Sequence, residues 1–146
     1  MNALERGIMD YLQISDTVAT AGQPTNSQIR GLSAAGYQVV INLRPTEDTP
    51  PDEPALVEEC GMTYVNIPVD WGAPTVEDVQ QFFAVMDAHG GKRRLVHCAR
   101  NMRVSAFMYM YRVVREGASA EEAEEDLHRI WAPAGVWREL IDEIVN

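Results

Sequence analysis

The hydrophobic and polar positions of this 146-residue chain follow two different periods. Short runs rich in apolar and β-branched residues are typical of strands, and they stand at 11–14, 17–20, 37–42, 62–67 and 94–97. Between them, apolar side chains recur at helical spacing in 26–35 and 76–89, and again in three segments from residue 104 onward. Because helices alternate with strands, the pattern predicts an α/β fold with a mostly parallel central sheet flanked by helices.

Turn and capping residues predict where these elements begin and end. Side chains or glycines suited to helix ends stand at Thr25 or Asn26, Gly36, Thr75, Gly90–Gly91, Ser119 and Gly135. A turn at Ser15–Asp16 joins the first two strands into an expected edge hairpin. Residues 44–54, rich in proline and acidic residues, are interpreted as an exposed loop before a short helix that ends near Gly61. No repeat or linker divides the chain, so residues 1–146 are expected to form one domain.

The chain is acidic, with a formal net charge of −10, and positions 121–126 hold five acidic residues. A general affinity for nucleic acid or for an anionic membrane is therefore not expected. Five of the twelve basic residues nevertheless fall close together: Lys92, Arg93, Arg94, Arg100 and Arg103. This cluster predicts a local positive region that suits an anionic ligand.

The start of the chain lacks the features of a secretory signal, and no stretch approaches the ~18 apolar residues of a membrane span, so a cytoplasmic location is expected. Cys60 and Cys98 are too few for a disulfide framework, and three scattered histidines complete no zinc spacing. We therefore expect no metal and no other cofactor, while the sequence leaves the oligomeric state open. Cys60, at the end of the short helix, is interpreted as structural.

The segment that begins at Cys98 carries the most specific chemistry. A strand that ends in a cysteine and leads through a short loop into a helix places the sulfur beside free N–H groups and the positive end of the helix dipole. Such surroundings favour the thiolate. Arg103 stands where the loop closes, so its planar guanidinium can bind two oxygens of a tetrahedral oxyanion. A buried structural cysteine is the alternative interpretation. The expected phosphate-binding residues are Ala99, Arg100, Asn101, Met102 and Arg103.

Three motifs in a fixed order resemble a known family. His97-Cys98-x-x-Asn101-x-Arg103 resembles the signature loop of protein tyrosine and dual-specificity phosphatases. Gly22-Gln23-Pro24 and a strand that ends in Ile41-Asn42-Leu43-Arg44 make the chain more similar still to the bacterial phosphatase-like family related to the beta-lactamase hydrolase-like proteins. The resemblance spans about residues 12–115, and three ordered motifs are more specific than any one of them.

The resemblance implies a phosphatase-like domain that hydrolyses a phosphomonoester of a protein or small molecule through a cysteinyl-phosphate intermediate. Such chemistry needs a group that protonates the leaving oxygen and then activates water. Asp70 is the candidate, with a turn-forming aspartate as the alternative interpretation and Asp78 as a weaker rival. His97 corresponds to the family histidine that orients the loop. Ser105 corresponds to a hydroxyl that assists the thiolate, unless it only bonds to the preceding helical turn.

Two further residues follow predicted strands toward the same edge of the sheet. Ligands of open α/β sheets gather at the carboxyl ends of strands, so Arg44 is a candidate to add positive charge, or else an ordinary loop arginine. Trp71, beside the candidate acid, is a candidate to cover the site as part of a lid. Trp131 and Trp137, at helical positions, are interpreted as core residues.

The loop departs from the common tyrosine-phosphatase pattern in length and composition. It has four residues between Cys98 and Arg103 where five are usual, and Val104 follows the arginine in place of serine or threonine. Asn101 stands where glycine is usual, and we expect it to preserve the turn because asparagine tolerates the left-handed conformation. A short loop after cysteine also resembles rhodanese-like sulfurtransferases. That activity and a non-catalytic phosphate-binding module are therefore the alternatives, although Asp70 and the upstream motifs favour a phosphatase.

Overall fold

The computed structural model describes residues 1–146 and contains one five-stranded sheet in the order β1-β2-β5-β3-β4. β1 (Leu12–Gln13) pairs antiparallel with β2 (Val18–Ala21), which is the predicted edge hairpin. β5 (Arg94–His97) lies parallel between β2 and β3 (Val39–Asn42), and β4 (Thr63–Asn66) pairs parallel with β3 at the far edge. The predicted α/β fold is confirmed, and β5 is its central strand.

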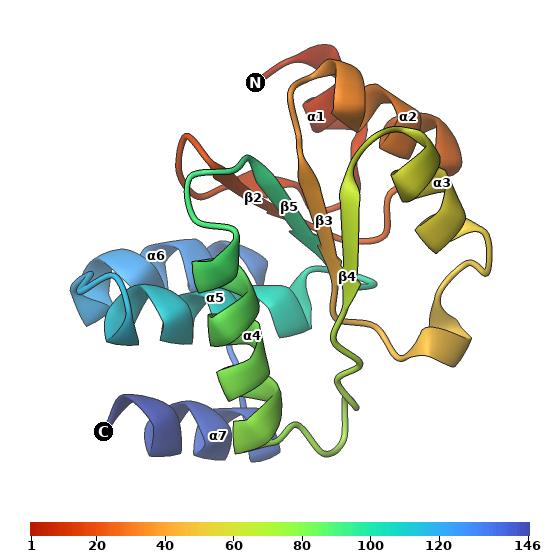
Figure 1. Ribbon diagram of the computed structural model, residues 1–146. Coiled ribbons are helices and arrows are strands. Elements are labelled where there is room, and N and C mark those ends of the chain that lie inside the picture. The colour runs from red at the N-terminus through yellow and green to blue at the C-terminus, as the bar shows by residue number, and fades with distance from the viewer.

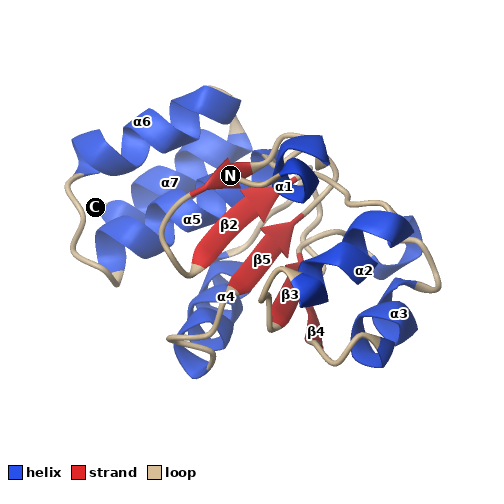
Figure 2. Ribbon diagram, turned by 90° about the horizontal axis from the view of Figure 1, so that it is seen from above, coloured by secondary structure: helices blue, strands red, loops and turns tan.

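Helices cover both faces of this sheet. α1, α2 and α3 lie on one face, and α4 to α7 lie on the other (Figure 1; Figure 2). Their bounds are Ala3–Gly7 (α1), Asn26–Ala34 (α2), Glu53–Glu59 (α3), Val76–Ala88 (α4), Met102–Val114 (α5), Ala120–Ile130 (α6) and Val136–Val145 (α7), and a 3₁₀ turn at Thr46–Asp48 precedes α3. None of these helices combines the length and the apolar character that crossing a bilayer requires.

Alternation along the strands gives each face of the sheet its own core. Val39 and Ile41 of β3 belong to the core under α4 to α7, whereas Val40 belongs to the core under α1 to α3. In β5, Val96 and Leu95 divide in the same way. Both faces of the central strands are therefore buried. For this reason their sequences are continuous apolar runs and do not alternate with polar residues.

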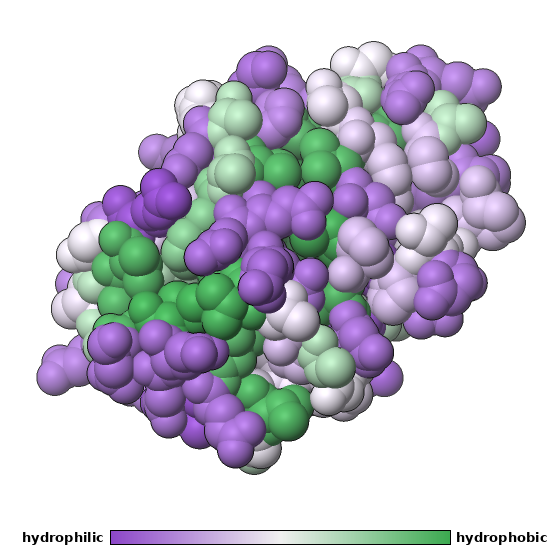
Figure 3. Space-filling view, turned by 60° about the horizontal axis from the view of Figure 1, so that its bottom comes forward, coloured by the Kyte–Doolittle hydropathy of each residue, from purple (hydrophilic) through white to green (hydrophobic).

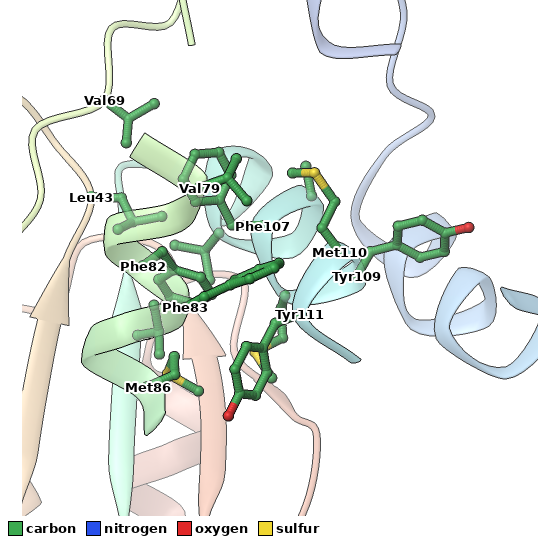
Figure 4. Packing of buried hydrophobic residues seen from close by; sticks show 14 of the residues in the cluster. Leu43, Val69, Val79, Phe82, Phe83, Met86, Phe107, Tyr109, Met110 and Tyr111 are labelled. Atoms are coloured by element: carbon green, nitrogen blue, oxygen red, sulfur yellow. The ribbon is translucent and has the colours of Figure 1, made fainter. Parts of the chain in front are cut away.

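The core under α4 to α7 holds α5 in place. Phe82 and Phe83 of α4 are directed toward Phe107 and Tyr111 of α5 (Figure 4). The ring centroids of Phe82 and Phe107 are 5.7 Å apart, and those of Phe83 and Tyr111 are 5.5 Å apart, both in edge-to-face arrangement. Such pairs stabilise by about 0.5–1.5 kcal/mol beyond the burial of their area. The aromatic contacts fix the helix whose N-terminus follows the Cys98 loop.

Hydroxyl side chains begin three helices as the sequence predicts: Thr25 (α2), Thr75 (α4) and Ser119 (α6). Asp78 completes a capping box with Thr75, so the weaker candidate for the acid is engaged in a helix cap. α1 was not predicted; this helix of five residues begins at a capping box between Asn2 and Glu5. A helix this short carries too little periodicity to be recognised.

The interpretation of residues 44–54 as an exposed loop is wrong at its end. α3 begins at Glu53, and this side chain is 0% exposed. A carboxyl group that is fully buried needs partners within the protein, because its transfer from water is otherwise very unfavourable. Its partners lie behind the cysteine loop and are described with the site.

The predicted positive region around 92–103 is also wrong, because β5 separates its members. At the amino end of β5, the Arg93 guanidinium pairs with Glu5 at 2.8 Å, and the buried Arg94 donates to the Met86 carbonyl at 2.9 Å. A strand of four residues carries the chain to the opposite edge of the sheet. Only Arg100 and Arg103 of the five therefore lie near the cysteine.

Candidate active site

Cys98 lies where the central strand ends. β5 ends at His97, and the Cys98 N–H donates to the Ala21 carbonyl at the end of β2. The cysteine is 1% exposed, and α5 begins shortly afterwards at Met102. The residue thus stands between the carboxyl edge of the sheet and the N-terminus of a 13-residue helix, where negative charge is stabilised.

The loop after Cys98 leaves backbone donors free. The amide groups of Ala99, Arg100, Met102 and Arg103 are among those that donate to no acceptor within the protein. Successive free N–H groups at a helix N-terminus carry partial positive charge and can bind the oxygens of an anion. The loop therefore has the donors that a phosphate group requires, without a glycine-rich sequence.

Asn101 gives the loop its turn. Its φ is 66° and its ψ is 0°, the left-handed conformation expected for this position. The side chain is fully buried and its amide donates to the Asp10 carbonyl at 2.8 Å and to the Thr20 hydroxyl at 3.0 Å. Asn101 thus points away from the anion-binding side and ties the loop to the β1–β2 hairpin, a task that glycine could not perform.

The Gly22-Gln23-Pro24 motif packs directly on the cysteine loop. The Gln23 N–H donates to the Ala99 carbonyl at 3.0 Å. A Cβ atom added at Gly22 would lie 2.6 Å from the same carbonyl oxygen, closer than real Cβ atoms approach. The motif therefore needs glycine because two backbones meet there.

Two adjoining hollows open beside Cys98. The first, of about 180 Å³, is lined by Trp71, Cys98, Ala99, Arg100, Met102 and Arg103. The second, of about 440 Å³, contains Asp70 and shares Trp71 and Arg103 with the first. Figure 3 turns the bottom of Figure 1 toward the viewer and shows hydrophobic side chains exposed among hydrophilic ones on this face. The structure therefore brings Cys98, Arg103 and Asp70 to the same region.

Arg103 connects the cysteine loop with the segment that carries Asp70. One guanidinium nitrogen, Nη1, donates to the Val69 carbonyl at 3.1 Å. Arg103 also lines both hollows. The Asp70 carboxylate accepts from the Gly72 N–H at 2.9 Å through Oδ1, while Oδ2 has no partner in the protein. One carboxylate oxygen thus fixes the loop, and the other can exchange a proton.

Three tryptophans hold the segment around Asp70 in place. The Trp71 ring lies 5.2 Å from that of Trp131 and 5.4 Å from that of Trp137, measured between centroids. The Trp137 indole N–H of α7 donates to the Trp71 carbonyl at 2.9 Å. Trp137 is a core residue, as expected, whereas the half-buried Trp131 packs against the candidate lid residue. Trp71 itself remains 44% exposed beside the cavity.

Behind the loop, His97 forms a buried pair with Glu53. The His97 Nε2 lies 2.8 Å from a Glu53 carboxylate oxygen, and both side chains are 0% exposed. Burial raises the pKa of Glu53, but the hydrogen bond and the charge of His97 outweigh it, so the net pKa lies below the ordinary value. Glu53 was not predicted as a site residue, because it stands in the acidic, proline-rich stretch that was interpreted as an exposed loop.

Ser105 and Arg44 do not line the cavity around Cys98, whereas Arg100 does. The Ser105 hydroxyl donates to the Met102 carbonyl at 3.0 Å and accepts from the Trp131 indole N–H at 3.1 Å. The bond to Met102 matches the alternative interpretation, in which Ser105 bonds to the preceding helical turn. The half-buried Arg44 donates to the Gln23 side chain at 3.0 Å and lines neither hollow. Arg100 lines the cavity with a side chain that is 72% exposed, 3.5 Å from Asp10.

Comparison with known proteins identifies the family. Residues 9–138 match the family model of the DSP-PTPase phosphatase fused to NAD+ kinase. The chain belongs to this family. It is also 27% identical over 121 residues to a beta-lactamase hydrolase-like protein of Xylella fastidiosa (strain Temecula1), a match that covers 80% of this chain and 28% of that protein. The resemblance inferred from the three motifs is therefore confirmed.

Solved structures carry the same fold. A Shewanella putrefaciens CN-32 protein of the DUF442 group, described as a candidate phosphatase, is 40% identical, with a TM-score of 0.86 over 97% of this chain and 94% of that one. The core catalytic domain of the PP-IP phosphatase SIW14 from S. cerevisiae shares only the fold, with 12% identity and a TM-score of 0.79 over 92% of this chain and 85% of that one. The chain thus has the fold of the cysteine phosphatases.

Proposed function

We propose that the protein hydrolyses phosphomonoesters through a cysteinyl-phosphate intermediate formed on Cys98. The observation that carries this proposal is the arrangement around one cavity of a cysteine, the unpaired backbone N–H groups of its loop and Arg103. Membership of the phosphatase family supports it. The substrate is a phosphorylated protein or small molecule, and no metal or other cofactor takes part in the proposed reaction.

The proposed reaction has two steps. In the first, the Cys98 thiolate attacks phosphorus while the bond from phosphorus to the ester oxygen breaks, and Asp70 gives its proton to that oxygen. The free amides and Arg103 bind the equatorial oxygens, where charge accumulates. In the second step, water attacks the cysteinyl-phosphate, Asp70 takes a proton from the water, and the thiolate leaves. The products are an alcohol and inorganic phosphate.

Assays of aryl phosphate hydrolysis test the assignment of the nucleophile. Cys98→Ser is expected to lower kcat by about a thousandfold or more, because the serine hydroxyl is not ionised at neutral pH. The same preparations are assayed for thiocyanate formation from thiosulfate and cyanide. Thiocyanate formation without phosphate release would identify a sulfurtransferase. An unchanged rate of aryl phosphate hydrolysis by Cys98→Ser would reject Cys98 as the nucleophile.

The acid is tested separately. Asp70→Asn is expected to lower kcat by about a hundredfold for an alkyl phosphate, and by less for an aryl phosphate whose leaving oxygen needs little protonation. Asp48→Asn is the matched control, since Asp48 is exposed and lines the same hollow as Asp70. Equal effects of the two variants, or equal effects on the two substrates, would reject Asp70 as the acid.

A further inference from the structure

Both ring nitrogens of His97 face oxygen acceptors. Nδ1 lies 3.3 Å from the Cys98 carbonyl oxygen, which can only accept a hydrogen bond. Nδ1 therefore carries a proton. Nε2 lies 2.8 Å from Glu53 Oε2, so the second proton of this pair stands either on Nε2 or on the carboxyl group. The position of that proton decides whether a positive charge lies next to the nucleophile.

The two upstream motifs favour a proton on the histidine. Arg44 can only donate, and its Nη1 lies 3.0 Å from Gln23 Oε1. This contact orients the Gln23 amide so that its nitrogen points to Glu53 and donates to Oε1 at 2.6 Å. The Glu53 carboxyl thus accepts at one oxygen from a neutral amide and faces His97 with the other. Donors on both sides stabilise the carboxylate, and the imidazolium becomes its counter-ion.

We propose that Glu53 is a positioning residue that keeps His97 protonated directly behind Cys98, with Gln23 and Arg44 fixing the direction of its hydrogen bonds. The inference rests on the proposed function insofar as it gives the charge a catalytic purpose. A cation held in a dry site acts on its neighbours more strongly than one in water. It favours the Cys98 thiolate without touching the substrate.

The other titratable and charged groups near this pair support the assignment. Tyr64 of β4 contributes to the lowered pKa of Glu53, and burial raises its own pKa to about 12, so it stays neutral. Arg44 is positive and reaches Glu53 only through Gln23. Cys98 is the remaining titratable neighbour on the His97 side. Glu53 is therefore the one anion in contact with the His97 ring.

The pH dependence of Cys98 alkylation by iodoacetamide tests this proposal, with the modified peptide quantified by mass spectrometry. Glu53→Gln preserves the shape of the side chain and removes its charge, so His97 is expected to lose its extra proton. The midpoint of the rate profile should then move upward by about one pH unit. Glu58→Gln, the same substitution at an exposed position of α3, should leave the midpoint unchanged.

A second variant shows whether Glu53 acts through the histidine. In a His97→Asn background the imidazolium is already absent, so adding Glu53→Gln should shift the midpoint no further. A purely structural role of Glu53 would lower stability in both backgrounds and leave the midpoint of the single variant at the wild-type value. That result would overturn the proposal, as would an equal shift in the two backgrounds.

The wild-type protein provides a test that needs no variant. Nitrogen NMR of the His97 ring should show both nitrogens protonated at pH 7.5, and a neutral ring would overturn the proposal. Neither measurement requires turnover. If the wild-type protein hydrolyses phosphomonoesters but Glu53→Gln leaves the alkylation midpoint unshifted, only the role of Glu53 is rejected. If Glu53→Gln shifts the midpoint but the wild-type protein hydrolyses no phosphomonoester, only the proposed function is rejected.

Discussion

At the scale of single residues, Asn101 shows how side-chain chemistry and backbone conformation combine in the cysteine loop. The left-handed φ of 66° turns the chain into α5, and glycine would provide that freedom equally well. The two hydrogen bonds from the side-chain amide to Asp10 and Thr20 are not available to glycine. The residue therefore contributes a turn and an anchor, and these contributions can be measured separately.

Substitutions at Asn101 separate the two contributions. Asn101→Gly keeps the turn and loses both hydrogen bonds, so the free energy of unfolding should fall by about 2 kcal/mol. Asn101→Ala also places a Cβ in the left-handed region, so the free energy of unfolding should fall by about 1 kcal/mol more than in Asn101→Gly. Urea unfolding of the three proteins measures both values. If alanine were no more destabilising than glycine, the backbone would not hold this conformation.

At the scale of elements, α7 supports the loop that carries Asp70. Trp137 is buried in the core, and its indole N–H reaches across to the Trp71 carbonyl. The loop has no strand or helix of its own between β4 and α4, so it is held by contacts of this kind: this hydrogen bond, the packed tryptophan rings and the Arg103 contact to Val69. In the proposed reaction Asp70 must be placed accurately to transfer a proton, so we expect the position of α7 to affect the rate.

Trp137→Phe tests this support. The variant keeps an aromatic ring and loses the donor to Trp71, so the loop should shift and kcat should fall by about tenfold or more. Alkylation of Cys98 should be unchanged, since the cysteine loop is not touched. Trp131→Phe is the control, because the Trp131 indole donates to Ser105 and not to the loop. Equal kcat values for the two variants would contradict the role of α7.

The elements could be predicted from the sequence to the extent that each carries a local signal. β5 has the predicted bounds and α6 begins after the predicted cap Ser119, since a buried run of four residues and a serine cap mark these elements clearly. The Cys98 loop was recognisable because strand, cysteine and arginine lie within one short segment. Glu53 was not, since its partners His97 and Gln23 are 44 and 30 positions away in the sequence. Contacts of this kind come from the packing of the sheet and leave no periodic signal.

At the scale of the whole molecule, the protein carries a formal net charge of −10. The basic residues that line the cavity around Cys98 are Arg100 and Arg103. Glu47 and Asp48 line the adjoining hollow together with Asp70. Anions are therefore attracted by the loop amides and two arginines, and repelled by most of the remaining surface.

That residues 1–146 form a single domain stays a prediction. Contacts between distant parts of the chain support it.

Glu5 makes one of these long-range contacts. The Glu5 carboxylate, on α1, accepts from the Tyr37 hydroxyl at 2.7 Å and pairs with Arg93, which is 88 positions away. Burial raises the pKa of Glu5, but hydrogen bonds from Asn2, Tyr37 and Tyr11 and the charge of Arg93 outweigh it, so the pKa falls to about 2. The lowered pKa means that the folded protein favours the carboxylate more than the unfolded chain does.

The stabilisation by Glu5 should therefore depend on pH. It is fully present above the unfolded value near 4.5 and is lost as the pH falls toward the folded value of about 2. At pH 7, Glu5→Gln should lower the free energy of unfolding by about 2 kcal/mol, and more than half of this difference should vanish by about pH 3. Urea unfolding between pH 7 and pH 3 measures it, with Glu59→Gln as an exposed control that shows little difference at either pH. A difference that stayed constant down to pH 3 would mean that Glu5 acts through its shape and not through its charge.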